Sequence, residues 1–264
     1  MKWEIIKKFS VRGKTCFCYA DVLAEFPDKD RSHLSKVLSS MVNMGMLMKF
    51  NRDLYCIIPL SADPETYTPD SRLVAKHIMK GKGYYIAYSS AMYLLGLSGQ
   101  PGAWTMVATD RQRQPSKKNI KGMEFHFIHH TYNRFFGFQE TWVSQQEQAM
   151  VSDLEKTIVD AVSKPQLCGG IVGVGKAIYR SKERTDLQKL FYYLARNGNH
   201  AAKKRYLFLS DILELEWTSE HDRMLDDSGV SISLLDPAGP VQGRKNSRFG
   251  LKINSEVSLS DFLQ

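Results

Sequence analysis

One stretch decides the fold of the first sixty residues: RSHLSKVLSSMVNMG, at positions 31–45. Its apolar residues recur at i, i+3, i+4, i+7 and i+8, the spacing of a single stripe along an amphipathic helix. They are Leu34, Val37, Leu38, Met41 and Val42. We expect Ser32 to cap the start of this helix and Gly45 to follow its end.

The opposite side of this helix is expected to carry short, polar or basic side chains and no carboxylate. Its residues are His33, Ser35, Lys36, Ser39, Ser40 and Asn43. A helix side that faces only water usually mixes in Glu and Asp, whereas a side that lies against phosphates and base edges excludes them. The pattern therefore favours DNA as the partner over a domain used only for protein contact.

The flanking sequence predicts a small domain around this helix. Residues 3–9 and 20–26 have helical spacing of apolar residues, with a β-prone run at 15–18 between them. Residues 46–50 and 54–58 predict a hairpin with a basic tip. The order helix, strand, helix, turn, helix, hairpin is that of a winged helix-turn-helix. In that fold the third helix enters the major groove and the wing touches the DNA backbone.

This fold assigns DNA-binding roles to particular residues. On the helix we expect the contacts to come from Arg31, Ser32, His33, Ser35, Lys36 and Ser39. On the wing we expect them from Lys49, Asn51 and Arg52. The cations would neutralise phosphates, and the polar helix residues would reach base edges or phosphate oxygens.

Beyond the hairpin, residues 59–65 form a mostly polar, proline-containing run that predicts a linker. We therefore predict a winged-helix DNA-binding domain at 1–60 and a larger domain at 66–264. In the larger domain, antiparallel strands come first and helices follow, which predicts an α+β class. Residues 152–155 (Ser-Asp-Leu-Glu) and 185–188 (Thr-Asp-Leu-Gln) have the pattern of capping boxes at two of these helices.

The charge of the chain favours an anionic partner. The net charge is +8, and residues 70–135 hold ten Lys and Arg against three acidic residues. Part of this excess falls in a basic loop expected at 111–121. Four of its residues are a candidate additional surface, for DNA or for a second role: Arg111, Arg113, Lys117 and Lys118.

The sequence predicts neither a membrane partner nor a metal. It has no apolar run of about 18 residues and no signal-peptide stretch at its start, so we expect a cytoplasmic protein. Cys16, Cys18, Cys56 and Cys168 lack the second ligand pair of a zinc site, and we expect them to be reduced and partly buried. His126, His129 and His130 have only Glu124 nearby, so we interpret them as core-edge or surface residues.

Catalytic patterns are incomplete. Residues 170–176 (GIVGVGK) have the spacing of a phosphate-binding loop, but Ala177 stands where Ser or Thr holds magnesium, and no strand precedes them. We interpret this segment as a flexible connection between helices and expect no cofactor. No hydrolase, metalloprotease or kinase motif is present, so we expect no enzyme. A nuclease with scattered acidic ligands, positioned by the winged helix, stays an alternative.

Two later segments resemble AbiEi-type antitoxins. Residues 84–91 (YYIAYSSA), then Leu94 and Gly96, are similar to the family's aromatic strand and Ser-Ala helix. Residues 106–109 (MVAT) are similar to the strand that follows. Residues 151–160 (VSDLEKTIVD), then Pro165 and Gly169-Gly170, are similar to the family block E-(K/R)-T-(L/I)-(V/L)-D…P…G-G. The order and spacing of this last block are kept over some twenty residues.

The resemblance implies a transcriptional regulator of a type IV toxin–antitoxin operon that acts in abortive phage infection. Members bind inverted repeats in their own promoter through the winged helix and repress it. Their C-terminal domain counters a nucleotidyltransferase toxin without requiring a stable complex. Some members are stand-alone regulators, and that role is the alternative within the family.

Overall fold

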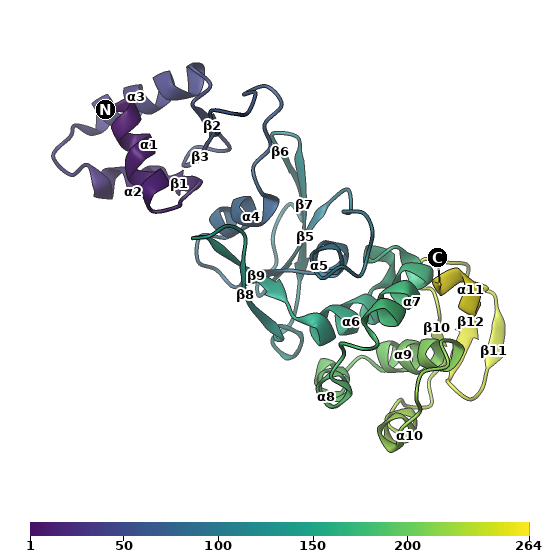
Figure 1. Ribbon diagram of the computed structural model, residues 1–264. Helices are drawn as coiled ribbons and strands as arrows, with labels where there is room; N and C mark the ends of the chain where they lie inside the picture. Colours follow the sequence, from purple (N-terminus) through teal and green to yellow (C-terminus); the bar gives the residue numbers. More distant parts are fainter. Residues whose placement is uncertain (264) are drawn as a thin grey trace.

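Six short elements form the N-terminal part of the molecule in the computed structural model, which describes residues 1–263 (Figure 1). In chain order they are α1 (Lys2–Val11), β1 (Cys16–Cys18), α2 (Tyr19–Glu25), α3 (Arg31–Asn43), β2 (Leu47–Lys49) and β3 (Leu54–Ile57). The strands pair antiparallel in the order β1-β3-β2. The predicted order of helices and strands is confirmed.

The apolar stripe of α3 anchors this helix to the N-terminal core. Leu34, Leu38 and Met41 are buried in a cluster that also holds Ile5 and Phe9. The cap lies earlier than predicted: α3 begins at Arg31, and the Asp30 carboxylate accepts a hydrogen bond of 2.9 Å from the backbone N–H of His33. The prediction of Ser32 as the cap is therefore wrong. A carboxylate at a helix start gains from the positive end of the helix dipole as well as from the hydrogen bond.

Two of the four cysteines form a disulfide. Cys16 and Cys56 stand opposite each other in the antiparallel pairing of β1 with β3, and their sulfurs are joined. The prediction of reduced thiols is wrong for this pair, because a pattern along the chain does not show which residues the sheet brings face to face. Cys18 and Cys168 are free thiols.

The rest of the chain is a mixed α+β structure, so the α+β class is confirmed. Its first half holds α4 (Ser71–Met79), β4 (Tyr84–Ile86), α5 (Tyr88–Leu94), β5 (Thr105–Thr109), β6 (Lys117–Ile120), β7 (Met123–His129), β8 (Phe138–Trp142) and β9 (Gln148–Ser152). Its second half holds α6 (Leu154–Ser163), α7 (Gly170–Ser181), α8 (Leu187–Asn197), α9 (His200–Ile212), α10 (Ser219–Asp226), β10 (Ser233–Leu234), β11 (Arg244–Asn246), β12 (Leu251–Ile253) and α11 (Leu259–Phe262). Short 3₁₀ turns lie at Tyr132–Arg134 and Pro165–Leu167.

The central sheet has six strands in the order β6-β7-β5-β4-β9-β8. The expectation of antiparallel strands is wrong for two pairs, because β5 with β7 and β4 with β9 run parallel. The chain crosses over through β6 before β7 joins β5, so β7 runs in the same direction as β5. The predicted basic loop at 111–121 is also wrong in part, because residues 117–120 form the edge strand β6.

Successive residues of the sheet alternate between two apolar clusters, as the two-residue period of a strand requires. Tyr85 and Ala87 face a cluster built with α6, α7, α8 and α9, whereas Tyr84 and Ile86 face a cluster built with α4. The second cluster also contains Cys16, Phe50, Leu54 and Cys56 of the N-terminal part. The sheet is therefore covered on both faces, and the N-terminal part packs against one of them (Figure 1).

Polar contacts reinforce this junction. The backbone N–H and the hydroxyl of Thr15 both donate to one oxygen of Glu147, at 2.9 and 2.5 Å. Lys80, which caps the C-terminal end of α4, forms an ion pair of 2.8 Å with Asp53 in the β2–β3 turn. The predicted boundary at 59–65 stays a prediction, but residues on its two sides share one apolar cluster.

Residues 170–176 lie inside α7, so their interpretation as a flexible connection is wrong. In the part of the chain that the structure describes, no helix has the length and apolar character needed to cross a bilayer.

The C-terminal strands are tied to α9 by a buried arginine. Arg205 donates to the backbone oxygens of Leu234 and Leu235, and on its other side to that of Val162 on α6. One guanidinium therefore joins α6, α9 and the start of the small sheet β10-β12-β11.

Candidate nucleic-acid interface

The outer side of α3 carries all six helix residues predicted to contact DNA. Arg31, Ser32, His33, Ser35, Lys36 and Ser39 are all exposed. The elements that pack most closely on α3 are α1, α2 and β2, all from the N-terminal part. This side of α3 is therefore open to a large partner.

Among residues 1–263, no ion pair is formed by four cations on this side: Arg31, Lys36, Lys49 and Arg52. Of these, Lys49 and Arg52 lie close enough to Asp53 to contribute to the lowering of its pKa. Other cations of the N-terminal part are paired, such as Lys8 and Arg12, which both contact Glu25. Asp53 lies beside Arg52, but its hydrogen bond and ion pair with Lys80 hold the pKa of this carboxyl below its usual value. The positive charge beside α3 is thus left for an external anion.

The tip of the β2–β3 hairpin is shaped by one of the predicted contact residues. The side-chain oxygen of Asn51 accepts hydrogen bonds from the backbone N–H groups of Asp53 at 2.8 Å and of Leu54 at 2.9 Å. Only the amide NH₂ of Asn51 remains to donate to a partner. The Nζ of Lys49 lies 5.4 Å from the ring centre of Tyr55.

The four further basic residues do not form one patch. Lys118 is paired with Phe125 across the β6–β7 ladder and shares its side of the sheet, where the N-terminal part packs. Lys117 is paired with His126 on the opposite side and lies 5.2 Å from the ring centre of Trp104. Arg113 covers the ring of Phe127 on the same side as Lys118, and Arg111 is exposed beyond the end of β5.

The turn between β6 and β7 adds a cation that the sequence reasoning missed. Lys121 lines one groove together with Lys49 and Met48 of the neighbouring hairpin. This groove places the β6–β7 turn next to the β2–β3 hairpin (Figure 1). The only signal in the sequence was the charge of the 111–121 segment, which does not show where the segment folds.

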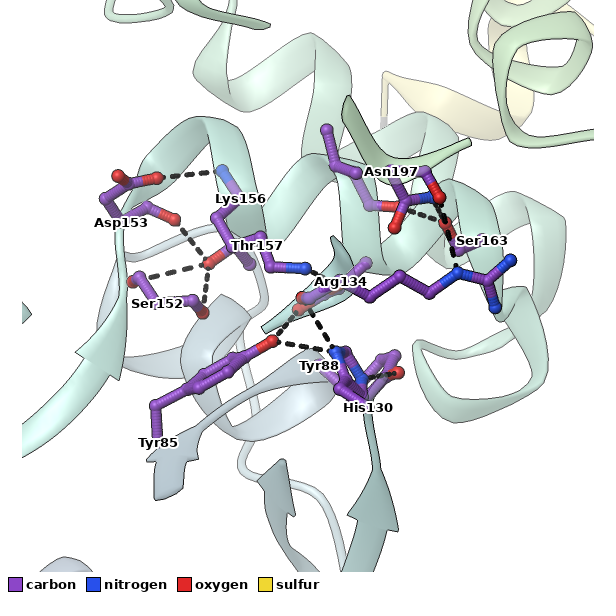
Figure 2. Close-up of polar contacts among 12 residues, drawn as sticks. Tyr85, Tyr88, His130, Arg134, Ser152, Asp153, Lys156, Thr157, Ser163 and Asn197 are labelled. Carbon is purple, nitrogen blue, oxygen red and sulfur yellow. Dashed lines mark hydrogen bonds and ion pairs between the residues drawn. The ribbon is translucent and has the colours of Figure 1, made fainter. Parts of the chain in front are cut away.

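A buried polar network beneath α6 is the other concentration of functional groups, and it too was missed (Figure 2). The Lys156 ammonium lies 2.5 Å from one oxygen of Asp160, and the Tyr85 hydroxyl donates to the other at 3.1 Å. The Tyr88 hydroxyl lies 2.7 Å from Nε2 of His130. His130, expected at the core edge or surface, is instead buried.

The hydrogen-bond pattern assigns the tautomer of His130. Its Nδ1 faces the backbone oxygen of Arg134 at 3.1 Å, which can only accept, so Nδ1 carries the hydrogen. Nε2 then accepts from the Tyr88 hydroxyl. Burial lowers the pKa of His130 because the charged ring would lose water. Tyr88 has φ of 51°, an uncommon conformation for a bulky residue, which persists only where the surroundings determine it.

The network joins the two segments that carry the family resemblance. Tyr85 and Tyr88 belong to the 84–91 segment, and Lys156 and Asp160 belong to the 151–160 block. The two blocks lie about seventy positions apart along the chain, and the sheet brings them into direct hydrogen-bond contact. Their residues therefore act together to hold α6 on the sheet.

The protein should lose stability as the pH falls below the pKa of an unfolded histidine, about 6.5. The folded-state pKa of His130 is lowered, so below this pH the unfolded chain binds a proton that the folded chain does not. The contribution is fully present above pH 6.5 and is lost as the pH falls towards the folded pKa. Urea unfolding at pH 7.5 and at pH 5.5 measures this contribution. Carboxyl groups ordinarily titrate below this pH range, so they contribute little to the difference.

The buried His221 and the half-buried His77 and His126 have lowered pKa values as well and add to the loss with the same sign. Replacing His130 with asparagine should therefore reduce the difference in unfolding free energy between pH 7.5 and pH 5.5 without removing it. The exposed His33 provides the matched control, His33→Asn. An equal pH dependence in wild type and His130→Asn would contradict the role of His130.

Among residues 1–263 no group of three or more His, Cys, Asp or Glu side chains lies together in a way that would hold a metal ion.

Comparisons with known proteins show a likeness in fold and none in sequence. No protein-family model matches the chain, and no curated protein matches it in sequence. The fold is similar to a crystal structure of the RV2827C protein from Mycobacterium tuberculosis, with a TM-score of 0.70 over 98% of this chain and 92% of that one. At 12% sequence identity, what the two chains share is the fold.

Proposed function

We propose that this protein is a DNA-binding transcriptional autorepressor and the antitoxin of a type IV toxin–antitoxin operon. Its N-terminal part, about residues 1–60, acts as a winged helix: α3 enters the major groove of promoter DNA and the β2–β3 hairpin contacts the backbone. The region from residue 66 onward has the antitoxin role and counters a nucleotidyltransferase toxin without a stable complex. The protein works in the cytoplasm and is not itself an enzyme.

The observation that carries the DNA-binding role is the outer side of α3. It is exposed and bears Arg31 and Lys36 without a carboxylate partner, while the opposite side is fixed in the core. Phosphates of a duplex supply the anions that these cations lack. Lys49 and Lys121 line a groove beside α3 with one acidic residue, Glu65, so its net charge is positive, and the DNA backbone flanking the site is expected to run past the β6–β7 turn.

Replacing Lys36 with alanine should weaken binding to the operon's own upstream DNA and flatten its salt dependence. Loss of one phosphate contact lowers the slope of log K against log salt by about 0.9. Fluorescence anisotropy with a labelled promoter duplex at several salt concentrations measures both effects. The control is Lys245→Ala, which removes an exposed lysine on β11, far from α3 (Figure 1).

An unchanged slope for Lys36→Ala would remove α3 from the DNA contact. Equal losses of DNA affinity for Lys36→Ala and Lys245→Ala would show that binding depends on the net charge of the protein and not on a defined site. Binding that is equally tight on an unrelated duplex would contradict sequence-specific recognition.

The antitoxin role rests on the resemblance of residues 84–91 and 151–160, which meet in the buried network. Expression of a nucleotidyltransferase encoded beside this chain should arrest growth, and co-expression of this chain should restore it. A variant with Lys36→Ala and Arg52→Ala should still restore growth from a foreign promoter, because DNA contact and neutralisation use different parts of the chain. Growth arrest that this chain does not relieve would contradict the antitoxin role.

A further inference from the structure

A basic row of Lys117, His126, Lys164 and Arg134 lies on the face of the central sheet that is turned away from the N-terminal part. Lys117 on β6 is paired with His126 on β7, Lys164 follows α6, and Arg134 ends the 3₁₀ turn after β7. Lys117 is exposed and the other three are partly exposed, so a ligand in solution can reach the row. Nε of Arg134 donates to the backbone oxygen of Asn197 at 3.3 Å (Figure 2). The terminal nitrogens of this guanidinium form no hydrogen bond among residues 1–263.

The positive charges of the basic row act on one another. Burial lowers the pKa of His126, and the charges of Lys117 and Lys164 lower it further. Burial also lowers the pKa of Lys164, and the charge of Arg134 lowers it further, while Asp160 partly offsets this effect. Like charges that are gathered in this way repel one another, so the row is expected to serve an external anion.

No carboxylate of the described chain neutralises the basic row. Lys117, Lys164 and Arg134 form no ion pair among residues 1–263. Asp160 is buried and already holds an ammonium group in the network beneath α6. Glu124 shares this face of β7, but it forms no ion pair with the row. The phosphates of a nucleic acid would supply the missing anions.

One end of the basic row meets a cavity with an exposed aromatic wall. The cavity has a volume of about 290 Å³ and lies between the start of α4, α5 and the start of β5. Tyr93 and Leu94 line it and are 45% and 37% exposed, so this wall is accessible from solvent. Trp104 lines it too, and its ring centre lies 5.2 Å from Nζ of Lys117 and 6.3 Å from the ring centre of His126.

The cavity suits a single flat ring. Its volume is close to about 300 Å³, the lower end of small-molecule pockets. The one carboxylate in its wall, Asp70, accepts hydrogen bonds from Nε and Nη2 of Arg72 at 2.9 and 2.6 Å, so its charge is balanced. Exposed aromatic rings beside a line of cations are the features with which proteins hold single-stranded nucleic acid. The cations follow the backbone, and the bases stack on the rings.

We propose that this surface binds single-stranded nucleic acid, RNA or DNA. The basic row contacts the phosphates, and the cavity holds one unpaired base against Tyr93. A duplex keeps its bases paired inside, so it cannot place one in the cavity. The surface lies on the other face of the sheet from the N-terminal part, so it is distinct from the α3 interface and does not depend on it.

Three fluorescein-labelled strands of about twelve nucleotides test this assignment on the full-length protein. They are oligo-dT, oligo-rU, and a strand of abasic sites that keeps the phosphates but has no bases. Fluorescence anisotropy should show that oligo-dT or oligo-rU binds about tenfold more tightly than the abasic strand, because the abasic strand cannot stack a base.

Four variants separate this surface from its alternatives. Lys117→Ala should weaken binding of the single strand and lower its slope of log K against log salt by about 0.7, the value for one phosphate. Lys118→Ala is the matched control and should change neither, because this neighbouring exposed lysine lies on the opposite face of β6. Tyr93→Ala should weaken binding of the oligonucleotide about tenfold and leave the abasic strand unchanged. The double variant Lys36→Ala with Arg52→Ala, which alters the α3 interface, should leave single-strand binding unchanged.

Each part of the assignment has an outcome that overturns it. Equal losses for Lys117→Ala and Lys118→Ala would reduce the effect to net charge. Equal binding of the abasic strand, or no effect of Tyr93→Ala, would remove the base from the cavity. A promoter duplex that loses as much affinity in Lys117→Ala as the single strand does would make the row part of a duplex interface. A preference for oligo-dT or for oligo-rU identifies the sugar, and either one supports the assignment.

Discussion

Replacing Asp160 with asparagine should lower the free energy of unfolding by about 3–5 kcal/mol, because it leaves a buried charge without its partner. Lys156 and Asp160 are 0% and 1% exposed, and the Lys156 ammonium has no other carboxylate within ion-pair distance in the described chain. Urea unfolding followed by circular dichroism at pH 7.5 measures the change. The resemblance block 151–160 thus holds a pair whose disruption has one of the largest effects expected in the molecule.

A partly exposed ion-pair cluster near the start of α6 provides the control. Lys189 forms ion pairs with Asp153 at 3.1 Å and Glu155 at 2.8 Å, but its side chain is 37% exposed. Lys189→Ala should therefore change the unfolding free energy by about 1 kcal/mol or less. A combined Lys156→Met and Asp160→Leu variant removes both buried charges and should recover part of the loss. An effect of Asp160→Asn no larger than that of Lys189→Ala would contradict this account.

The second large effect is expected at Arg205. Its guanidinium donates to the backbone oxygens of Leu234 at 2.9 Å, Leu235 at 2.9 Å and Val162 at 3.0 Å. Burial lowers the pKa of Arg205 to about 10, so the group stays charged at neutral pH. Arg205→Met keeps the apolar stem but leaves these carbonyls without donors. The free energy of unfolding should fall by about 1–3 kcal/mol for each carbonyl that stays buried and unsatisfied.

Hydrogen exchange distinguishes this effect from a general loss of stability. In Arg205→Met, the amides of residues 231–254 should exchange faster than those of β4 and β5, because the guanidinium holds the small sheet to α9. Arg184→Met is the matched control, since the side chain of the exposed Arg184 has one hydrogen bond among residues 1–263, to the backbone oxygen of Leu95. A uniform rise in exchange throughout the larger part would contradict this local role.

The sequence predicted what depends on local periodicity. The stripe from Leu34 to Val42 correctly identified the buried side of α3. Apolar residues at i, i+3 and i+4 lie on one side of a helix, and that side packs against the core. The helix ends were less accurate. Serine or threonine was predicted as the cap at Ser32, Ser152 and Thr185, whereas the caps are Asp30, Asp153 and Asp186. Where both residue types stand near the start of a helix, the carboxylate is favoured by the helix dipole.

Contacts between distant segments were not predictable from patterns. Nothing along the chain pairs Cys16 with Cys56, or Tyr85 with Asp160, because those contacts depend on strand order and register. The same reason explains Lys121: its charge was visible, but its place beside Lys49 follows from the crossover that makes β6 an edge strand. The exposed side of α3 could be predicted because it depends on local sequence. The position of Lys121 beside it could not, because it depends on how distant segments fold together.

The disulfide between Cys16 and Cys56 affects what proteolytic cleavage does to this protein. It closes a ring that contains α2, α3 and the β2–β3 hairpin. A protease that cuts once anywhere inside the ring opens the backbone but releases no fragment, so both pieces stay on one covalent molecule. After a cut between α2 and α3, thiol treatment is needed to separate α3 from α1, and the nicked protein would migrate as a single band on a denaturing gel until reductant is added.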